Sequence, residues 1–235
     1  MVIWLVLLAY IANSADEAVQ YVRKIAEDHP DLIKLMITGG VLDAKAKGEP
    51  GELKMPAEYV KAACEEAHHL GLKVAAHVES PEGVRVALEN GVDTIEHGAQ
   101  PDETILSLFK ERHACQVATI ITLPCLMALF DRSISHATEM EQYNGNIVFE
   151  GIINCAKACL ENDIPVGLGT DTGCPYVTHY DMWRELHYFH KYVGVSNAFA
   201  LYTATLNSAV MAGFGFLSCF SNKYKDLLTR SYKIR

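Results

Sequence analysis

Residues 73–97 read KVAAHVESPEGVRVALENGVDTIEH and contain one complete strand, helix and strand unit. Residues 73–77 and 93–97 are short and largely apolar, which is typical of buried strands. Residues 81–90 between them predict a helix that begins at a proline and ends before Gly91. Two strands joined through a helix indicate a parallel sheet.

The same pattern recurs along most of the chain. Helices are predicted near 15–28, 57–70, 103–111 and 146–161, and strands near 32–37, 116–121 and 165–171. Five alternating units predict an α/β protein with a parallel sheet and helices outside it. Both a doubly wound sheet and a (β/α)8 barrel fit this pattern. No GxGxxG motif follows a strand, so a dinucleotide-binding open sheet has no support.

Composition restricts the class of ligand and the compartment. Half of the 235 residues are hydrophobic and 21% are charged, as in a globular protein. The formal charge of −9 argues against a nucleic-acid partner, because phosphate binding needs a basic surface. Small molecules are therefore the expected ligands. Seven scattered cysteines without a CxxC pair favour a reducing compartment, which indicates a cytoplasmic protein.

Both ends differ in composition from the middle of the chain. Residues 1–13 form an apolar N-terminal segment that is too short to span a membrane. It lacks the basic residues that open a signal peptide, so a buried strand or a truncated start is preferred. Residues 214–235 are predicted to be a divergent, solvated basic tail. Residues 14–213 between them are predicted to form the folded domain.

Four ionisable residues lie in or at the end of predicted strands. Lys34 is inside its strand, whereas His77, His97 and Asp171 end theirs. In a barrel the C-terminal ends of the strands form the active face, so these groups would converge there and indicate a metal site. A single histidine after a strand is more often a packing residue. A lysine inside an apolar strand, however, is costly unless it is paired or neutral, and a neutral amine can form a carbamate that bridges metals.

Five segments carry a resemblance to a known family. They are IKLMITGG at 33–40, VAAH at 74–77, TIEHG at 94–98, GLGTDTG at 167–173 and the helix-like stretch 198–213. Together they resemble the amidohydrolase superfamily, in the imidazolonepropionase-like branch that includes Xaa-Pro dipeptidases. The resemblance covers residues 14–213 and implies an incomplete TIM-type (β/α)8 barrel with about five βα units.

The resemblance also implies roles for particular residues. A carboxylated Lys34 would bridge two divalent metals, usually Zn²⁺, and His77 and His97 would hold the more exposed ion. Asp171 would bind the more buried ion and shuttle a proton as the catalytic residue. The loop of Thr38, Gly39 and Gly40 would line the substrate side, and His179, in the loop after Asp171, is a further candidate for substrate contact.

Three functional hypotheses follow. The first is a metal-dependent hydrolase that cleaves the C–N bond of a small amide or dipeptide through a metal-activated water. The second is a catalytically inactive, truncated homologue with a partial metal site, because the family pattern begins with His-x-His and this chain has no such pair. The third is an unrelated α/β binding protein. Because five strands of a barrel would leave two sheet edges and an inner face uncovered, a homo-oligomer is also expected.

Overall fold

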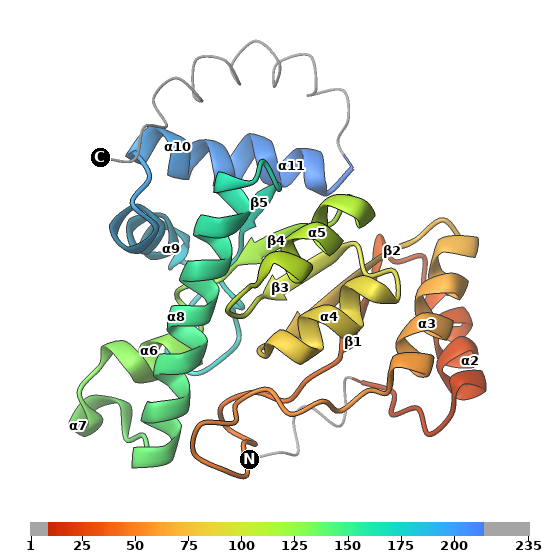
Figure 1. The fold of residues 1–235 in the computed structure, drawn as a ribbon, viewed down its shortest axis with the longest axis horizontal. Coiled ribbons are helices and arrows are strands. Elements are labelled where there is room, and N and C mark those ends of the chain that lie inside the picture. The colour runs from red at the N-terminus through yellow and green to blue at the C-terminus, as the bar shows by residue number, and fades with distance from the viewer. Residues whose placement is uncertain (1–8, 214–235) are drawn as a thin grey trace.

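The computed structural model describes residues 9–213, which form one parallel sheet with helices packed against it (Figure 1). The strands pair in chain order and are β1 (Leu32–Met36), β2 (Lys73–Val78), β3 (Thr94–His97), β4 (Cys115–Ala118) and β5 (Val166–Leu168). A doubly wound sheet reverses its order at a switch point, whereas a barrel adds each strand beside the last. The predicted partial barrel is therefore confirmed.

The helices of the repeating units are α2 (Ala15–Ala26), α3 (Ala57–His69), α4 (Pro81–Glu89), α5 (Glu103–Arg112) and α8 (Glu139–Glu161). Figure 1 shows α3, α4, α5 and α8 on one face of the sheet. The side chains of Ser14, Ser80 and Asp102 cap α2, α4 and α5 by accepting hydrogen bonds from backbone N–H groups. Thr138 and Glu141 form a reciprocal capping box, which starts α8 before the predicted residue 146.

Several elements were not predicted or differ from the prediction. Helices α6 (Leu123–Leu129) and α7 (Arg132–Ser135) follow β4, and α9 (Met182–Tyr188) continues into the π-helical segment η1 (Phe189–Val193). The predicted helix at 198–213 is a run of α10 (Asn197–Tyr202), the π-helical η2 (Thr203–Asn207) and α11 (Ser208–Met211). Strand β4 ends at Ala118 rather than near residue 121, because the backbone N–H groups of Ile120 and Ile121 donate to the Glu185 carboxylate.

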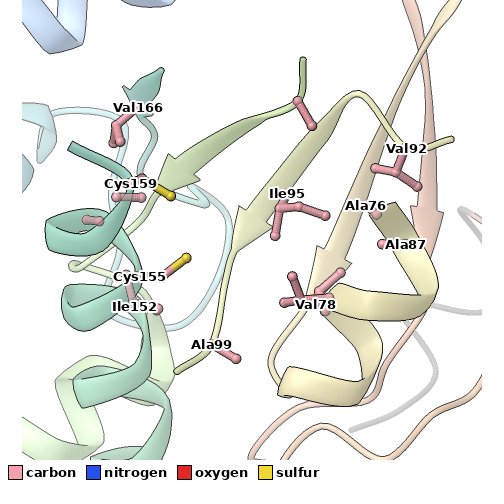
Figure 2. Packing of buried hydrophobic residues seen from close by; sticks show 14 of the residues in the cluster. Ala76, Val78, Ala87, Val92, Ile95, Ala99, Ile152, Cys155, Cys159 and Val166 are labelled. Atoms are coloured by element: carbon pink, nitrogen blue, oxygen red, sulfur yellow. The ribbon is translucent and has the colours of Figure 1, made fainter. Parts of the chain in front are cut away.

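The two faces of the sheet are buried to different extents. On the outer face, Ile33, Val74 and Ile95 are at most 2% exposed beneath the helices. Figure 2 shows Val78 and Ile95 on this side, with Ala87 of α4 and Cys155 of α8 around them. On the inner face of β1, Leu32, Lys34 and Met36 are all exposed, and Leu32 and Met36 are each 45% exposed. Strand β1 is thus buried on its outer face only, in agreement with the uncovered inner face expected of five barrel strands.

The two sheet edges also differ. Along β5, the Leu168 N–H donates to Ser208 Oγ at 3.3 Å and Asn207 Nδ2 donates to the Val166 carbonyl at 2.5 Å. The end of η2 and the start of α11 therefore satisfy part of this edge. Within residues 9–213, no strand pairs with the other side of β1. The β1 edge is therefore open within the described residues, whereas the β5 edge is partly covered. The oligomeric state stays a prediction.

The predicted apolar start and basic tail fall largely outside the described residues. Of the segment 1–13 the structure describes only residues 9–13, and it describes none of 214–235. Across the described part of the chain, no helix combines the length and apolar character needed to cross a bilayer.

Candidate metal centre

His77 and His97 lie side by side at the C-terminal end of the sheet. Their ring centroids are 4.7 Å apart, and the rings meet edge to face at 73°. The strand register pairs His77 with Glu96, and Val78 with His97, so alternation alone would send the two histidines to opposite faces. The left-handed backbone at His97 (φ 67°) and Gly98 (φ 95°) ends the strand and brings the His97 ring beside His77.

Neighbouring groups hold each imidazole. His97 Nδ1 lies 2.6 Å from Thr119 Oγ1, and both residues are buried. His77 forms a hydrogen bond with the backbone of Gly39. When Nδ1–H of His97 donates to Thr119, Nε2 retains the lone pair that a metal ligand needs. Thr119 was not predicted as part of the site, because the sequence placed it inside the strand expected at 116–121.

Burial keeps both histidines neutral. It lowers the pKa of His77 to about 4, and the positive charge of Lys34 adds to this effect. Burial lowers the pKa of His97 well below its ordinary value, with smaller contributions from His77 and Lys34. Neutral imidazole is the form of histidine that binds a metal. The two rings are therefore suited to the ligand role that the resemblance implies, although that role remains a prediction.

Glu79 belongs to the same cluster and was missed in the sequence analysis. One candidate ligand atom from each of His77, Glu79 and His97 lies within 4.8 Å of the other two. Glu79 is 4% exposed, and its Oε2 has no hydrogen-bond partner within the described chain. The sequence spacing could have predicted it. Residues i and i+2 of an extended segment point the same way, and Glu79 follows His77 by two residues.

The electrostatics of Glu79 reflect its burial. Loss of solvent raises the pKa of its carboxyl to about 8, and the charges of Asp171 and Asp43 act in the same direction. A hydrogen bond from the Val41 backbone acts in the opposite direction. Two nitrogen ligands and one carboxylate oxygen are a ligand set typical of zinc-class ions. The unpaired Oε2 of Glu79 is available as the oxygen ligand. The residues present thus fit such an ion.

Lys34 lies on the same face of the sheet as His77, one row further from the rim. The register pairs Lys34 with Ala75 and Met36 with His77. Lys34 Nζ is 3.9 Å from Glu96 Oε2, and the Lys34 side chain is 41% exposed. Burial lowers the pKa of Lys34, although the charges of Glu96 and Asp171 oppose this effect. A lowered pKa favours the neutral amine that carboxylation requires. The carbamate itself remains a prediction.

Asp171 lies in the exposed loop after β5. Its charge affects the pKa values of Lys34, His77 and Glu96, which places it near the cluster. Its carboxylate is nevertheless outside the group of three ligands, and its Oδ2 accepts a hydrogen bond from Cys174 Sγ at 3.2 Å. Asp171 has a left-handed backbone (φ 53°), which is uncommon for a residue other than glycine and is often found at functional sites.

The predicted substrate loop packs directly on Glu79. Thr38 is 1% exposed, and its Oγ1 donates to the Gly39 carbonyl at 2.8 Å and accepts from the Glu79 N–H at 3.0 Å. A Cβ on Gly40 would lie 2.9 Å from Glu79 Oε2, so glycine allows the close approach. The buried Thr38 hydroxyl thus supports the loop. His179 is exposed between β5 and α9. Substrate contact by any of these residues remains a prediction.

Comparisons with known proteins agree with this fold and site. Residues 5–215 match the amidohydrolase family. The chain is 24% identical to ochratoxinase from Aspergillus niger over 205 residues, which are 86% of this chain and 40% of the enzyme. A Bifidobacterium longum protein proposed to be a prolidase superposes with a TM-score of 0.79 at 33% identity, over 88% of this chain and 50% of that one.

A Xaa-Pro dipeptidase structure with methionine in its active site is also similar. It superposes with a TM-score of 0.74 at 28% identity, over 86% of this chain and 48% of that one. The family match covers most of the sequence, and the protein is a member of the amidohydrolase family. Its chain spans less than half of ochratoxinase and about half of the two solved structures.

Proposed function

We propose that this protein is a metal-dependent hydrolase that cleaves the C–N bond of a small amide or peptide substrate, such as a dipeptide. The pair of neutral imidazoles at the carboxyl ends of β2 and β3 carries this proposal, since amidohydrolase chemistry needs ligands at that position of the sheet. The similarity to an Xaa-Pro dipeptidase and to a proposed prolidase supports a dipeptide as substrate.

The proposed centre holds one or two zinc-class ions. A bound divalent ion supplies a Lewis acid for the substrate carbonyl and lowers the pKa of a water molecule. His77 and His97 would hold the first ion, Asp171 would hold a second one, and a carboxylated Lys34 would be a ligand of both. The Asp171 carboxylate takes the proton of the attacking water and passes it to the leaving amine. The loop of Thr38, Gly39 and Gly40 lines the substrate side, and His179 contacts the substrate.

An inactive homologue with a partial metal site is the second candidate. One observation favours it, namely the absence of any His-x-His pair in the sequence, although the family pattern begins with one. Both candidates bind metal, and they differ in turnover. We further propose that the protein works on small molecules in a reducing compartment such as the cytoplasm and self-associates through its uncovered sheet surface.

Hydrolysis by the purified chain tests the proposal directly. The protein is incubated with Zn²⁺ and a panel of Xaa-Pro dipeptides and N-acyl amino acids, and released amine is measured. We expect amine release that is lost in His97→Ala and retained in His69→Ala, because His69 is exposed on α3. Metal binding without release of any amine would favour the inactive homologue. Metal content that is unchanged in a His77→Ala, His97→Ala double variant would contradict both.

A further inference from the structure

We propose that Glu79 is the third protein ligand of the ion held by His77 and His97, so that one complete ligand set comes from β2, β3 and the residues directly after β2. The inference rests on the metal site of the proposed function and extends it. It differs from the ligand set implied by the family resemblance, in which Lys34 joins the two histidines on this ion and Asp171 binds the other ion.

The spacing of the three residues suits a single ion. Their candidate ligand atoms already lie within 4.8 Å of one another. Zinc binds nitrogen and oxygen ligands at about 2.0–2.2 Å, which separates the ligand atoms of a tetrahedral site by roughly 3.4 Å. Closing the set therefore needs changes of about an ångström, which side-chain rotations can supply. The fourth position of such a set stays available to water or substrate.

The unpaired oxygen of Glu79 indicates a cation. Glu79 is 4% exposed, and no ion pair involving it occurs among residues 9–213. The other buried glutamate near this rim, Glu185, uses both oxygens to accept from the backbone N–H groups of Ile120 and Ile121. An unsatisfied buried carboxylate oxygen is unfavourable. A metal ion between Glu79 and the histidines would supply the missing partner.

The surroundings of Glu79 hold it in place for this role. The Thr38 hydroxyl accepts from its backbone N–H, and Val41 contributes a backbone hydrogen bond to its carboxylate. Gly40 leaves room for Oε2 where a side chain would collide with it. Thr119 forms a hydrogen bond with the ring of His97 through Nδ1. A ligand set fixed by its neighbours is the usual condition for tight metal binding.

Lys34 and Asp171 each have another partner among the described residues. Lys34 Nζ is directed toward Glu96, at 3.9 Å, and Asp171 Oδ2 accepts from Cys174. The Asp171 carboxylate is outside the group of three whose ligand atoms already converge. Because His77, Glu79 and His97 supply three ligands by themselves, the ion between the histidines should persist without Lys34.

Cobalt binding by the full 235-residue chain tests the assignment. Chelator-treated protein is titrated with Co²⁺, and the visible absorption reports both affinity and coordination. The variants are Glu79→Gln, which keeps the shape and removes the charge, Lys34→Ala, and Glu82→Gln as the control, because Glu82 is exposed in the first turn of α4. We expect Glu79→Gln to weaken Co²⁺ binding at least tenfold and to change the spectrum, whereas Glu82→Gln and Lys34→Ala each keep one bound ion.

A structural role for Glu79 predicts a different result. If Glu79 served only packing, Glu79→Gln would lower the melting temperature of the metal-free protein. We expect that temperature to stay unchanged and only the stabilisation by added metal to shrink. Parental affinity and spectrum in Glu79→Gln would overturn the inference, while loss of binding in the His77→Ala, His97→Ala variant would leave the proposed function standing. Co²⁺ binding that survives in the His77→Ala, His97→Ala variant would contradict the proposed metal site itself.

Discussion

The two faces of the sheet share the same strands and differ in what their side chains do. The outer face carries apolar residues such as Val74 and Ile95, which are fully buried under the helices. The inner face carries Lys34, His77 and Glu96, which are partly exposed and influence one another electrostatically. Since alternate residues of a strand face opposite ways, one stretch of sequence serves both stability and chemistry.

Two buried glutamates also differ in whether their side chains serve stability or chemistry. Glu185 has both oxygens hydrogen-bonded to backbone N–H groups, whereas Glu79 keeps one oxygen unpaired beside two neutral histidines. A satisfied buried carboxylate holds the fold together. An unsatisfied one, placed beside potential ligands, points to a function for the group.

The largest expected effect on stability is at Glu185. Replacing it by alanine leaves the buried N–H groups of Ile120 and Ile121 without their acceptor. Because each unsatisfied donor costs about 1–3 kcal/mol, Glu185→Ala should lower the free energy of unfolding by about 3 kcal/mol. Urea unfolding followed by circular dichroism measures this. A loss below about 1 kcal/mol would mean that water replaces the carboxylate.

Glu185 also predicts a dependence of stability on pH. Burial raises the pKa of its carboxyl from 4.5 to about 8 in the native state. Between these values the native protein keeps a proton that the unfolded chain releases, so stability should fall as pH rises, by up to about 1.4 kcal/mol per pH unit. Glu185→Gln should reduce this slope. The difference between parent and variant isolates Glu185, since Glu79 titrates in both; an identical slope in both proteins would contradict the prediction.

Matched valine substitutions compare the two faces directly. Val74 is fully buried on the outer face, while Val117 is partly exposed on the inner face. Removal of buried methyl groups leaves a cavity, so Val74→Ala should lower the free energy of unfolding by about 2 kcal/mol and Val117→Ala by about 1 kcal/mol or less. Denaturant unfolding of both variants measures this. Equal losses would show that the inner face is covered in solution.

Lys34 variants should affect metal content more than stability. Since the Lys34 side chain is 41% exposed, Lys34→Ala should change the free energy of unfolding by less than about 1 kcal/mol. If a carbamate at Lys34 bridges to a second ion, Lys34→Ala should lose that second equivalent and Lys34→Glu should recover part of it. Metal analysis after dialysis gives the stoichiometry. A second equivalent retained in Lys34→Arg would exclude the bridging role.

The smallest expected effect on stability is at the open edge of the sheet. Met36 of β1 is 45% exposed on the inner face, so Met36→Lys should barely change the free energy of unfolding. Charged residues on an edge strand oppose pairing with another chain. We therefore expect the parent to sediment as a dimer or larger species at micromolar concentration and the variant to shift toward monomer. A parent that sediments as a monomer would contradict self-association.

Much of the architecture followed from local sequence signals. Apolar runs and the turns at Gly71 and Gly91 predicted the strands and helices around β2 and β3, because burial and chain reversal leave clear local patterns. The positions of Lys34, His77 and His97 in or near the ends of their strands were also predictable, since parallel strands direct their carboxyl ends to one rim. Asp171 was expected to end its strand, but β5 ends at Leu168 and Asp171 lies in the loop after it. The family resemblance then agreed with the family match.

Only the tertiary structure decided which polar groups meet. The left-handed turn at His97 brings its ring beside His77, and Glu79 enters the same cluster. Thr119, directly after β4, forms a hydrogen bond with His97. The hydrogen bonds of Asn207 and Ser208 to the β5 edge could not be predicted from the sequence either. These contacts depend on backbone angles and on distances between segments far apart in the chain. Local sequence patterns report the burial of each segment, whereas the meeting of polar atoms depends on how the segments pack in three dimensions.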